Sequence, residues 1–82
     1  MKLELYHFES CPYCKRVIKA INELGLKDKI AMYDTLEDPA AGDRLLAIND
    51  DEQVPCLVVD GKPMLESDEI IAWLKENKSN IG

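Results

Sequence analysis

The stretch LELYHFESCPYCKRVIKAINELG, residues 3–25, decides the fold of this chain. Its first residues alternate apolar and polar side chains, which predicts a strand over residues 2–7. Apolar side chains then recur at helical spacing, and Pro12 suits the first turn of a helix, where its missing N–H costs nothing. Gly25 is typical of the position that ends a helix, so the sequence predicts a helix over residues 12–24.

A second strand is expected soon after this helix, over residues 29–33. A strand, a helix and a strand within this length form a βαβ unit, whose two strands should be parallel. Asp38-Pro39 then marks the start of a second helix, which ends in the polar run of residues 49–51.

The remaining chain predicts two more strands and a last helix. Residues 54–59 are a continuous apolar run, typical of a strand that is covered on both faces. Asp60-Gly61 is a strong signal for a hairpin turn, and residues 64–65 would form a short strand after it. Ser67 is a suitable cap for the final helix.

The predicted order of elements is therefore βαβ-α-ββα. The simplest packing of that order is an α/β fold with a mixed four-stranded sheet, flanked by its three helices on both faces. The length of 82 residues supports a single domain over residues 1–82, with a frayed tail over residues 79–82.

Composition excludes several classes of function. The chain has 10 basic and 16 acidic residues and a net charge of −6, which argues against binding to nucleic acid. No apolar run approaches the ~18 residues of a membrane span. An acidic fourth residue does not fit a signal peptide, so a cytoplasmic location is expected. Lys15, Arg16 and Lys19 form a local basic group, interpreted either as a solvated helix face or as a positive rim for an anionic ligand.

The three cysteines are too few for a disulfide scaffold. Cys11 and Cys14 lie close together, whereas Cys56 stands far along the chain. This pattern suits a reducing compartment in which the close pair performs chemistry.

Cys11-Pro12-Tyr13-Cys14 lies where the first strand gives way to the first helix. The positive end of a helix stabilises a thiolate, and residues three apart on a helix lie about 5–6 Å from each other, within disulfide range. Cys11, at the helix start, is expected to be exposed and to be the nucleophile. Cys14, one turn further in and more shielded, is expected to resolve the mixed disulfide that Cys11 forms.

A zinc site is the metal alternative, because the chain also contains Cys56 and His7, nominally a Cys₃His set with the close pair. Cys56 lies in an apolar run, where a buried structural thiol is the ordinary case. No metal is therefore expected.

The combination of Cys11-Pro12-Tyr13-Cys14 after a first strand with Val54-Pro55 before a later strand resembles a dithiol glutaredoxin. The second half, from Gln53 to Asp68, resembles the N-terminal domain of glutathione transferases. Taken together, residues 2–76 are similar to glutaredoxins built on a transferase-like thioredoxin fold.

This resemblance implies that glutathione is the co-substrate. In the family the residue before the loop proline offers its backbone to the cysteinyl part of glutathione, and here that residue is Val54. Pro55 should then be cis. The transferase pair that binds the γ-glutamyl end corresponds to Glu66 and Ser67, and Tyr13 could line the same groove.

The chain also departs from the family. Asp68 is the alternative γ-glutamyl contact if glutaredoxin geometry applies. Phe8 stands where glutaredoxins usually carry a lysine, and residues 64–66 replace their glycine-rich turn. The glycyl carboxylate of glutathione thus lacks its usual partner, and Lys15 or Gln53 is expected to substitute.

The resemblance implies a monomeric, glutathione-dependent thiol–disulfide oxidoreductase of the glutaredoxin type. Its partners would be glutathionylated or disulfide-containing proteins. Two alternatives stay open: a thioredoxin-like protein-disulfide reductase that does not use glutathione, and a module that binds a metal or an iron–sulfur cluster.

Overall fold

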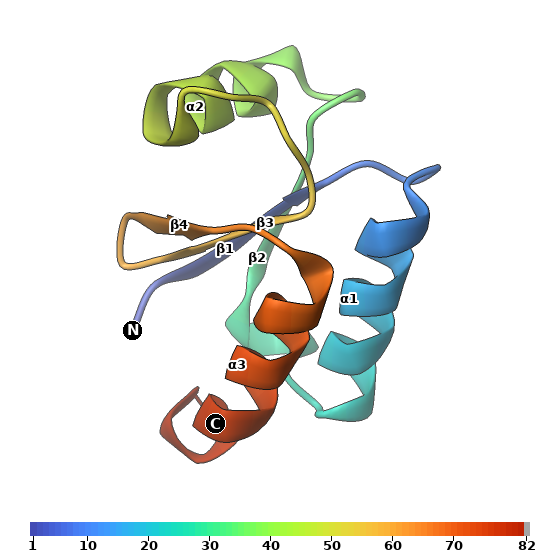
Figure 1. Cartoon of the computed structure of the whole chain (residues 1–82), viewed down its shortest axis with the longest axis vertical. Helices are drawn as coiled ribbons and strands as arrows, with labels where there is room; N and C mark the ends of the chain where they lie inside the picture. Colours follow the sequence, from blue (N-terminus) through green and yellow to red (C-terminus); the bar gives the residue numbers. More distant parts are fainter. Residues whose placement is uncertain (82) are drawn as a thin grey trace.

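The computed structural model describes residues 1–81 and follows the predicted order of elements, with one turn of 3-10 helix added. Within these residues no helix has the length and apolarity that a membrane span requires. The elements are β1 (Leu3–His7), α1 (Pro12–Glu23), the 3-10 helix η1 (Lys27–Lys29), β2 (Ala31–Asp34), α2 (Pro39–Asn49), β3 (Cys56–Val59), β4 (Lys62–Met64) and α3 (Ser67–Ile81) (Figure 1).

The strands form one mixed sheet in the order β2-β1-β3-β4. β1 is parallel to β2, as the βαβ prediction requires, and antiparallel to β3, which pairs antiparallel with β4. The register places Leu5 opposite Met32 on one side and Leu57 on the other. β1 is therefore an interior strand, hydrogen-bonded along both edges.

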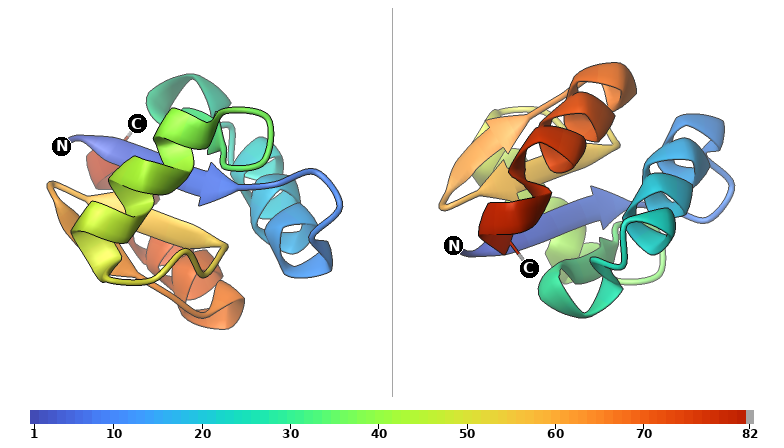
Figure 2. Two further views of the ribbon diagram at one scale, coloured as in Figure 1. Left: turned by 90° about the horizontal axis from the view of Figure 1, so that it is seen from above. Right: turned by 90° about the horizontal axis from the view of Figure 1, so that it is seen from below.

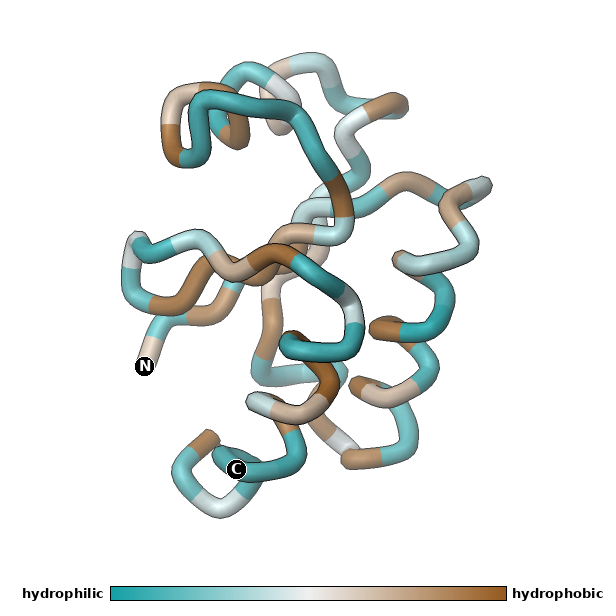
Figure 3. The backbone as a smooth tube through the Cα atoms, viewed as in Figure 1, coloured by the Kyte–Doolittle hydropathy of each residue, from teal (hydrophilic) through white to brown (hydrophobic). Residues whose placement is uncertain are grey.

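Helices cover both faces of this sheet, as predicted. α1 and α3 lie side by side on one face, and α2 crosses the other (Figure 2). Alternation along β1 sends Leu3 and Leu5 into the core under α1 and α3, and Tyr6 into a smaller core under α2. Figure 3 shows apolar segments along the central strands, between the two helical layers.

Two strands begin two residues later than the sequence predicted, whereas β1 begins one residue later, at Leu3. β2 starts at Ala31 because residues 27–29 close a 3-10 turn, in which the Lys29 amide donates to the Leu26 carbonyl at 2.9 Å. β3 starts at Cys56 rather than at residue 54, and Pro55 has no N–H to donate to a neighbouring strand.

The hairpin between β3 and β4 forms as predicted. Asp60 and Gly61 both have positive φ, 49° and 86°, as the favoured two-residue hairpin turn requires. The strand after the turn is Lys62–Met64 instead of residues 64–65. Pro63 is accommodated because β4 lies at the edge of the sheet.

The end of the chain differs from the prediction of a frayed tail over residues 79–82. α3 continues to Ile81, and residue 82 lies outside the described residues. Ile81 is partly buried against the core under α1 and α3, which gives the last turn an apolar anchor.

Leu5 is fully buried on the interior strand, so we expect Leu5→Ala to lower the free energy of unfolding by about 2–5 kcal/mol through lost burial and a residual cavity. Leu36→Ala is the matched control, because that side chain is 68% exposed and its loss should cost less than about 0.5 kcal/mol. Urea denaturation followed by circular dichroism measures both, and equal effects would contradict the position of the core.

Candidate functional site

Three segments from distant parts of the chain meet at one end of the strands of the sheet. Tyr6, near the end of β1, pairs with Cys56, the first residue of β3. Met64, the last residue of β4, pairs with Leu57. The chain that follows β4 therefore starts α3 at this same end of the strands. The loop that enters α1, the turn before β3 and the first residues of α3 are therefore neighbours.

Cys11 caps the N-terminus of α1. Its backbone is extended and its sulfur accepts a hydrogen bond from the Cys14 amide at 3.3 Å. Its carbonyl accepts from the Lys15 amide at 3.1 Å, so the helix begins on this residue. An amide donor at the positive end of a helix stabilises negative charge on sulfur, which is the environment a reactive thiol needs.

The prediction that Cys11 would be exposed is wrong, since only 6% of its surface remains accessible. Its sulfur turns back over the first turn of α1 to accept the Cys14 amide, instead of projecting into solvent. The predicted shielding of Cys14 is confirmed, at 0% exposure. The two cysteines therefore differ in the expected sense, because only Cys11 of the pair retains some accessible surface.

Burial is the largest cause that raises the pKa of the Cys14 thiol, followed by its side-chain hydrogen bond to Cys11, and together the causes raise that pKa to about 12. Cys14 is therefore a neutral thiol at pH 7. Burial also raises the pKa of Cys56, which lies in the core under α2. Neither thiol is a ready nucleophile in the reduced protein.

A groove of about 240 Å³, named here the cis-proline groove, opens beside the cysteines. The Val54–Pro55 peptide bond on its wall is cis, as the resemblance implied. Neither cysteine lines this groove, but Tyr13 between them does. The structure brings together all five residues that the resemblance implied for glutathione. The lining residues are Tyr13, Arg16, Gln53, Val54, Pro55, Glu66, Ser67 and Asp68.

The start of α3 forms one end of this groove. Glu66 has a positive φ of 68° and Ser67 is the first helical residue, so Ser67 does not occupy the cap position that the sequence predicted. The Ser67 hydroxyl instead accepts from the Arg16 guanidinium at 3.4 Å, and Arg16 also pairs with Asp68 at 2.6 Å. Both partners are exposed, so this ion pair contributes at most about 1 kcal/mol of stability, and its main effect is to place a cation at the groove.

Arg16 is the groove residue that sequence reasoning missed, having placed it only in the basic group of α1. Its partners Ser67 and Asp68 are 51 and 52 positions away, and no local pattern reveals that pairing. Of the two residues expected at the glycyl carboxylate, Gln53 lines the cis-proline groove, whereas Lys15 borders a separate hollow near Asp34.

The possible metal ligands are not gathered. Within residues 1–81 no group of three or more histidine, cysteine or acidic side chains has an arrangement that could hold a metal ion. The nominal set of Cys11, Cys14, Cys56 and His7 is thus not assembled. Cys56 faces the core under α2 with Tyr6, on the opposite side of the sheet from the core of α1.

Residues 5–80 match the family model described as glutathione S-transferase, N-terminal domain. The chain therefore belongs to this family, which confirms one half of the resemblance found in the sequence. No curated protein matches the chain significantly.

Solved structures establish that the fold is thioredoxin-like. The thioredoxin-like protein BC3987 is 28% identical, with a TM-score of 0.76 over 92% of this chain and 97% of that one. A glutathione transferase family member from Pseudomonas fluorescens Pf-5, solved with bound glutathione, is 26% identical, with a TM-score of 0.77 over 93% of this chain and 38% of that one. Glutathione transferase Omega 3C from Trametes versicolor, 24% identical, has a TM-score of 0.80 over 100% of this chain and 36% of that one. This chain thus spans little more than a third of these transferases.

The different environments of the thiols predict selective alkylation of the reduced protein at pH 7. Iodoacetamide should modify Cys11 and leave Cys14 and Cys56 unmodified, as read by tandem mass spectrometry. In Cys11→Ser, Cys14 should stay unreactive until the solution is strongly alkaline, because burial keeps its pKa high. Modification of Cys14 at neutral pH would contradict this assignment.

Proposed function

We propose that the protein is a glutathione-dependent thiol–disulfide oxidoreductase that reduces protein–glutathione mixed disulfides and small disulfides. The observation that carries this proposal is the placement of a helix-capping thiol beside a groove formed by Val54, Pro55 and Ser67. Membership of the transferase N-terminal family and the glutathione bound to the Pseudomonas relative support glutathione as the ligand.

The groove offers recognition along the length of an extended peptide. The backbone at Val54 pairs with the cysteinyl part of glutathione in the manner of an added strand. The γ-glutamyl carboxylate lies against Ser67 at the positive end of α3, with the Arg16 guanidinium beside it, and the γ-glutamyl ammonium faces Glu66 or Asp68. Gln53 is the neutral partner for the glycyl end.

The first chemical step is attack of the Cys11 thiolate on the glutathione sulfur of a mixed disulfide. The bond between that sulfur and the substrate protein breaks, a Cys11–glutathione disulfide forms, and the substrate thiolate leaves and takes a proton from water. The substrate cysteine is reduced, and Cys11 is oxidised to the mixed disulfide.

The second step regenerates Cys11. A second glutathione thiolate attacks the bound glutathione sulfur, so that oxidised glutathione leaves and the Cys11 thiolate returns. Alternatively, Cys14 attacks the Cys11 sulfur, forms the Cys11–Cys14 disulfide and releases glutathione. Burial raises the pKa of Cys14 and favours the first route, because Cys14 must lose a proton before it can attack.

A second candidate is a protein-disulfide reductase that does not use glutathione. It is favoured by the near full-length similarity to the thioredoxin-like protein BC3987. In that case the Cys11–Cys14 disulfide would be an obligatory intermediate. Either function places the protein in a reducing compartment, in keeping with the expected cytoplasmic location.

The two candidates differ in the role of Cys14. With glutathione and glutathione reductase as the only reducing system, Cys11→Ser should abolish turnover of a small glutathione mixed disulfide, whereas Cys14→Ser should retain it. NADPH consumption measures both, and Cys56→Ser is the control that should leave turnover near the wild-type rate. Equal loss in both variants would overturn the glutathione route and favour the second candidate.

The groove assignment has its own test. Ser67→Ala should raise KM for the glutathione mixed disulfide by roughly tenfold, as expected from the loss of a hydrogen bond to a charged group, with little change in kcat. Ser79→Ala, on an exposed turn of the same helix, is the matched control. An unchanged KM in Ser67→Ala would show that glutathione does not bind at the start of α3.

A further inference from the structure

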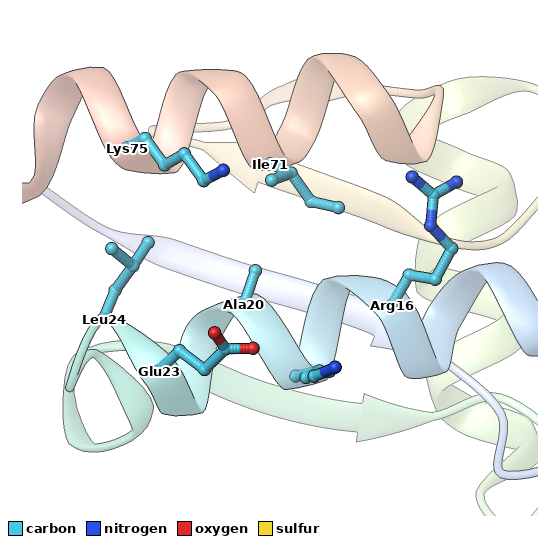
Figure 4. A pocket seen from close by; sticks show the side chains of 7 residues that line it. Arg16, Ala20, Glu23, Leu24, Ile71 and Lys75 are labelled. Atoms are coloured by element: carbon cyan, nitrogen blue, oxygen red, sulfur yellow. The ribbon is translucent and has the colours of Figure 1, made fainter.

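A second groove, named here the α1–α3 groove, lies along the seam between the two helices and has a volume of about 360 Å³. Figure 4 shows its lining, with Ala20 and Ile71 facing each other across the seam and Lys75 extending over it from α3. Ala20, Leu24 and Ile71 are only partly buried, so the seam retains apolar surface. The lining residues are Arg16, Lys19, Ala20, Glu23, Leu24, Ile71 and Lys75.

The charge of this groove is opposite to that of the whole protein. The chain carries −6, yet three of the seven lining residues are cations and Glu23 is the one acid. Within residues 1–81 Arg16 is paired with Asp68, whereas neither Lys19 nor Lys75 has a carboxylate within salt-bridge distance. Both lysines are exposed, so their charge is available to a partner.

The α1–α3 groove adjoins the proposed glutathione site at Arg16. Arg16 lines both this groove and the cis-proline groove. A polypeptide whose cysteine lies at Cys11 can therefore run along the seam without leaving the surface of the protein. Glutathione occupies the cis-proline groove in the proposed function, so the α1–α3 groove is left for the substrate protein itself.

We propose that the α1–α3 groove binds an acidic segment of the substrate protein that carries the disulfide, with Lys19 and Lys75 as its charge contacts. This inference rests on the proposed function and adds the chemistry of its partner. Charge complementarity selects the occupant: the chain as a whole carries a net charge of −6, whereas cations outnumber acids three to one among the residues that line this seam. Apolar side chains within the segment would contact Ala20, Leu24 and Ile71.

The helical geometry fixes the spacing of the acidic residues. Lys19 lies eight positions after Cys11, which corresponds to about 12 Å along the axis of α1. An extended peptide advances about 3.3–3.6 Å per residue. The acidic side chains should therefore stand about three to five residues from the reacting cysteine.

The test compares synthetic glutathionylated peptides in the same coupled assay. One peptide carries two glutamates three to five residues from its cysteine, a second has glutamines in their place, and a third has the glutamates directly beside the cysteine. At low salt, kcat/KM should be about tenfold higher for the first peptide than for the second, and intermediate for the third. High salt should remove the difference, because the contacts are exposed charges.

A charge-reversal pair supplies the matched variants. Lys19→Glu/Lys75→Glu should abolish or invert the preference for the acidic peptide and leave turnover of a small glutathione mixed disulfide unchanged. Lys27→Glu/Lys62→Glu changes the net charge equally at exposed positions outside the groove and should keep most of the preference. An equal effect in both double variants would overturn the proposal in favour of a general effect of net charge.

The failures are distinguishable. A wild-type protein that turns over the small mixed disulfide but treats the peptides alike would overturn the docking surface and leave the proposed function standing. No turnover of any glutathione mixed disulfide would overturn both. Sedimentation that shows a dimer dispersed by Lys19→Glu/Lys75→Glu would assign the seam to a second copy of the chain and likewise overturn the proposal.

Discussion

The hydrogen bond from the Cys14 amide to the Cys11 sulfur is the interaction on which the site depends. It starts α1 on a cysteine, where most helices use an oxygen side chain. The same bond draws the Cys11 sulfur inward and fixes the first turn that carries Cys14 beneath it. A spacing of three residues thus produces two sulfurs in different environments, one capping a helix at the surface edge and one fully buried.

The sheet supplies the rest of the site by its topology. Because β1 pairs antiparallel with β3, the end of β1 lies beside the start of β3. The antiparallel hairpin of β3 and β4 then returns the chain to the same end of the strands, where it enters α3. The turn at Val54–Pro55 and the helix start at Ser67 therefore lie beside the first turns of α1, although more than 40 positions separate them from Cys11 in the sequence. Any change in strand order would disperse these three segments.

Much of this arrangement was predictable because it rests on local rules. Helical periodicity, a proline in the first turn and an Asp-Gly hairpin each act within a few residues, and the corresponding elements formed close to their expected bounds. The strand starts were less predictable, since a 3-10 turn delays β2 and Pro55 lacks a donor before β3. The burial of Cys11 was mispredicted because the sequence does not show which way its sulfur turns.

The sequence by itself determined that two thiols stand at the start of a helix after a strand, because residue spacing and backbone preference are properties of a short segment. Only the tertiary structure decided that Arg16 meets Ser67 and Asp68, and that Lys19 and Lys75 border one seam. These arrangements follow from the packing of α1 against α3 on one face of the sheet. Burial of apolar side chains from both helices sets the distance between the two helices. Polar and charged residues on the outer sides of the helices are carried into contact by that packing, and no pattern within either helix specifies their partners.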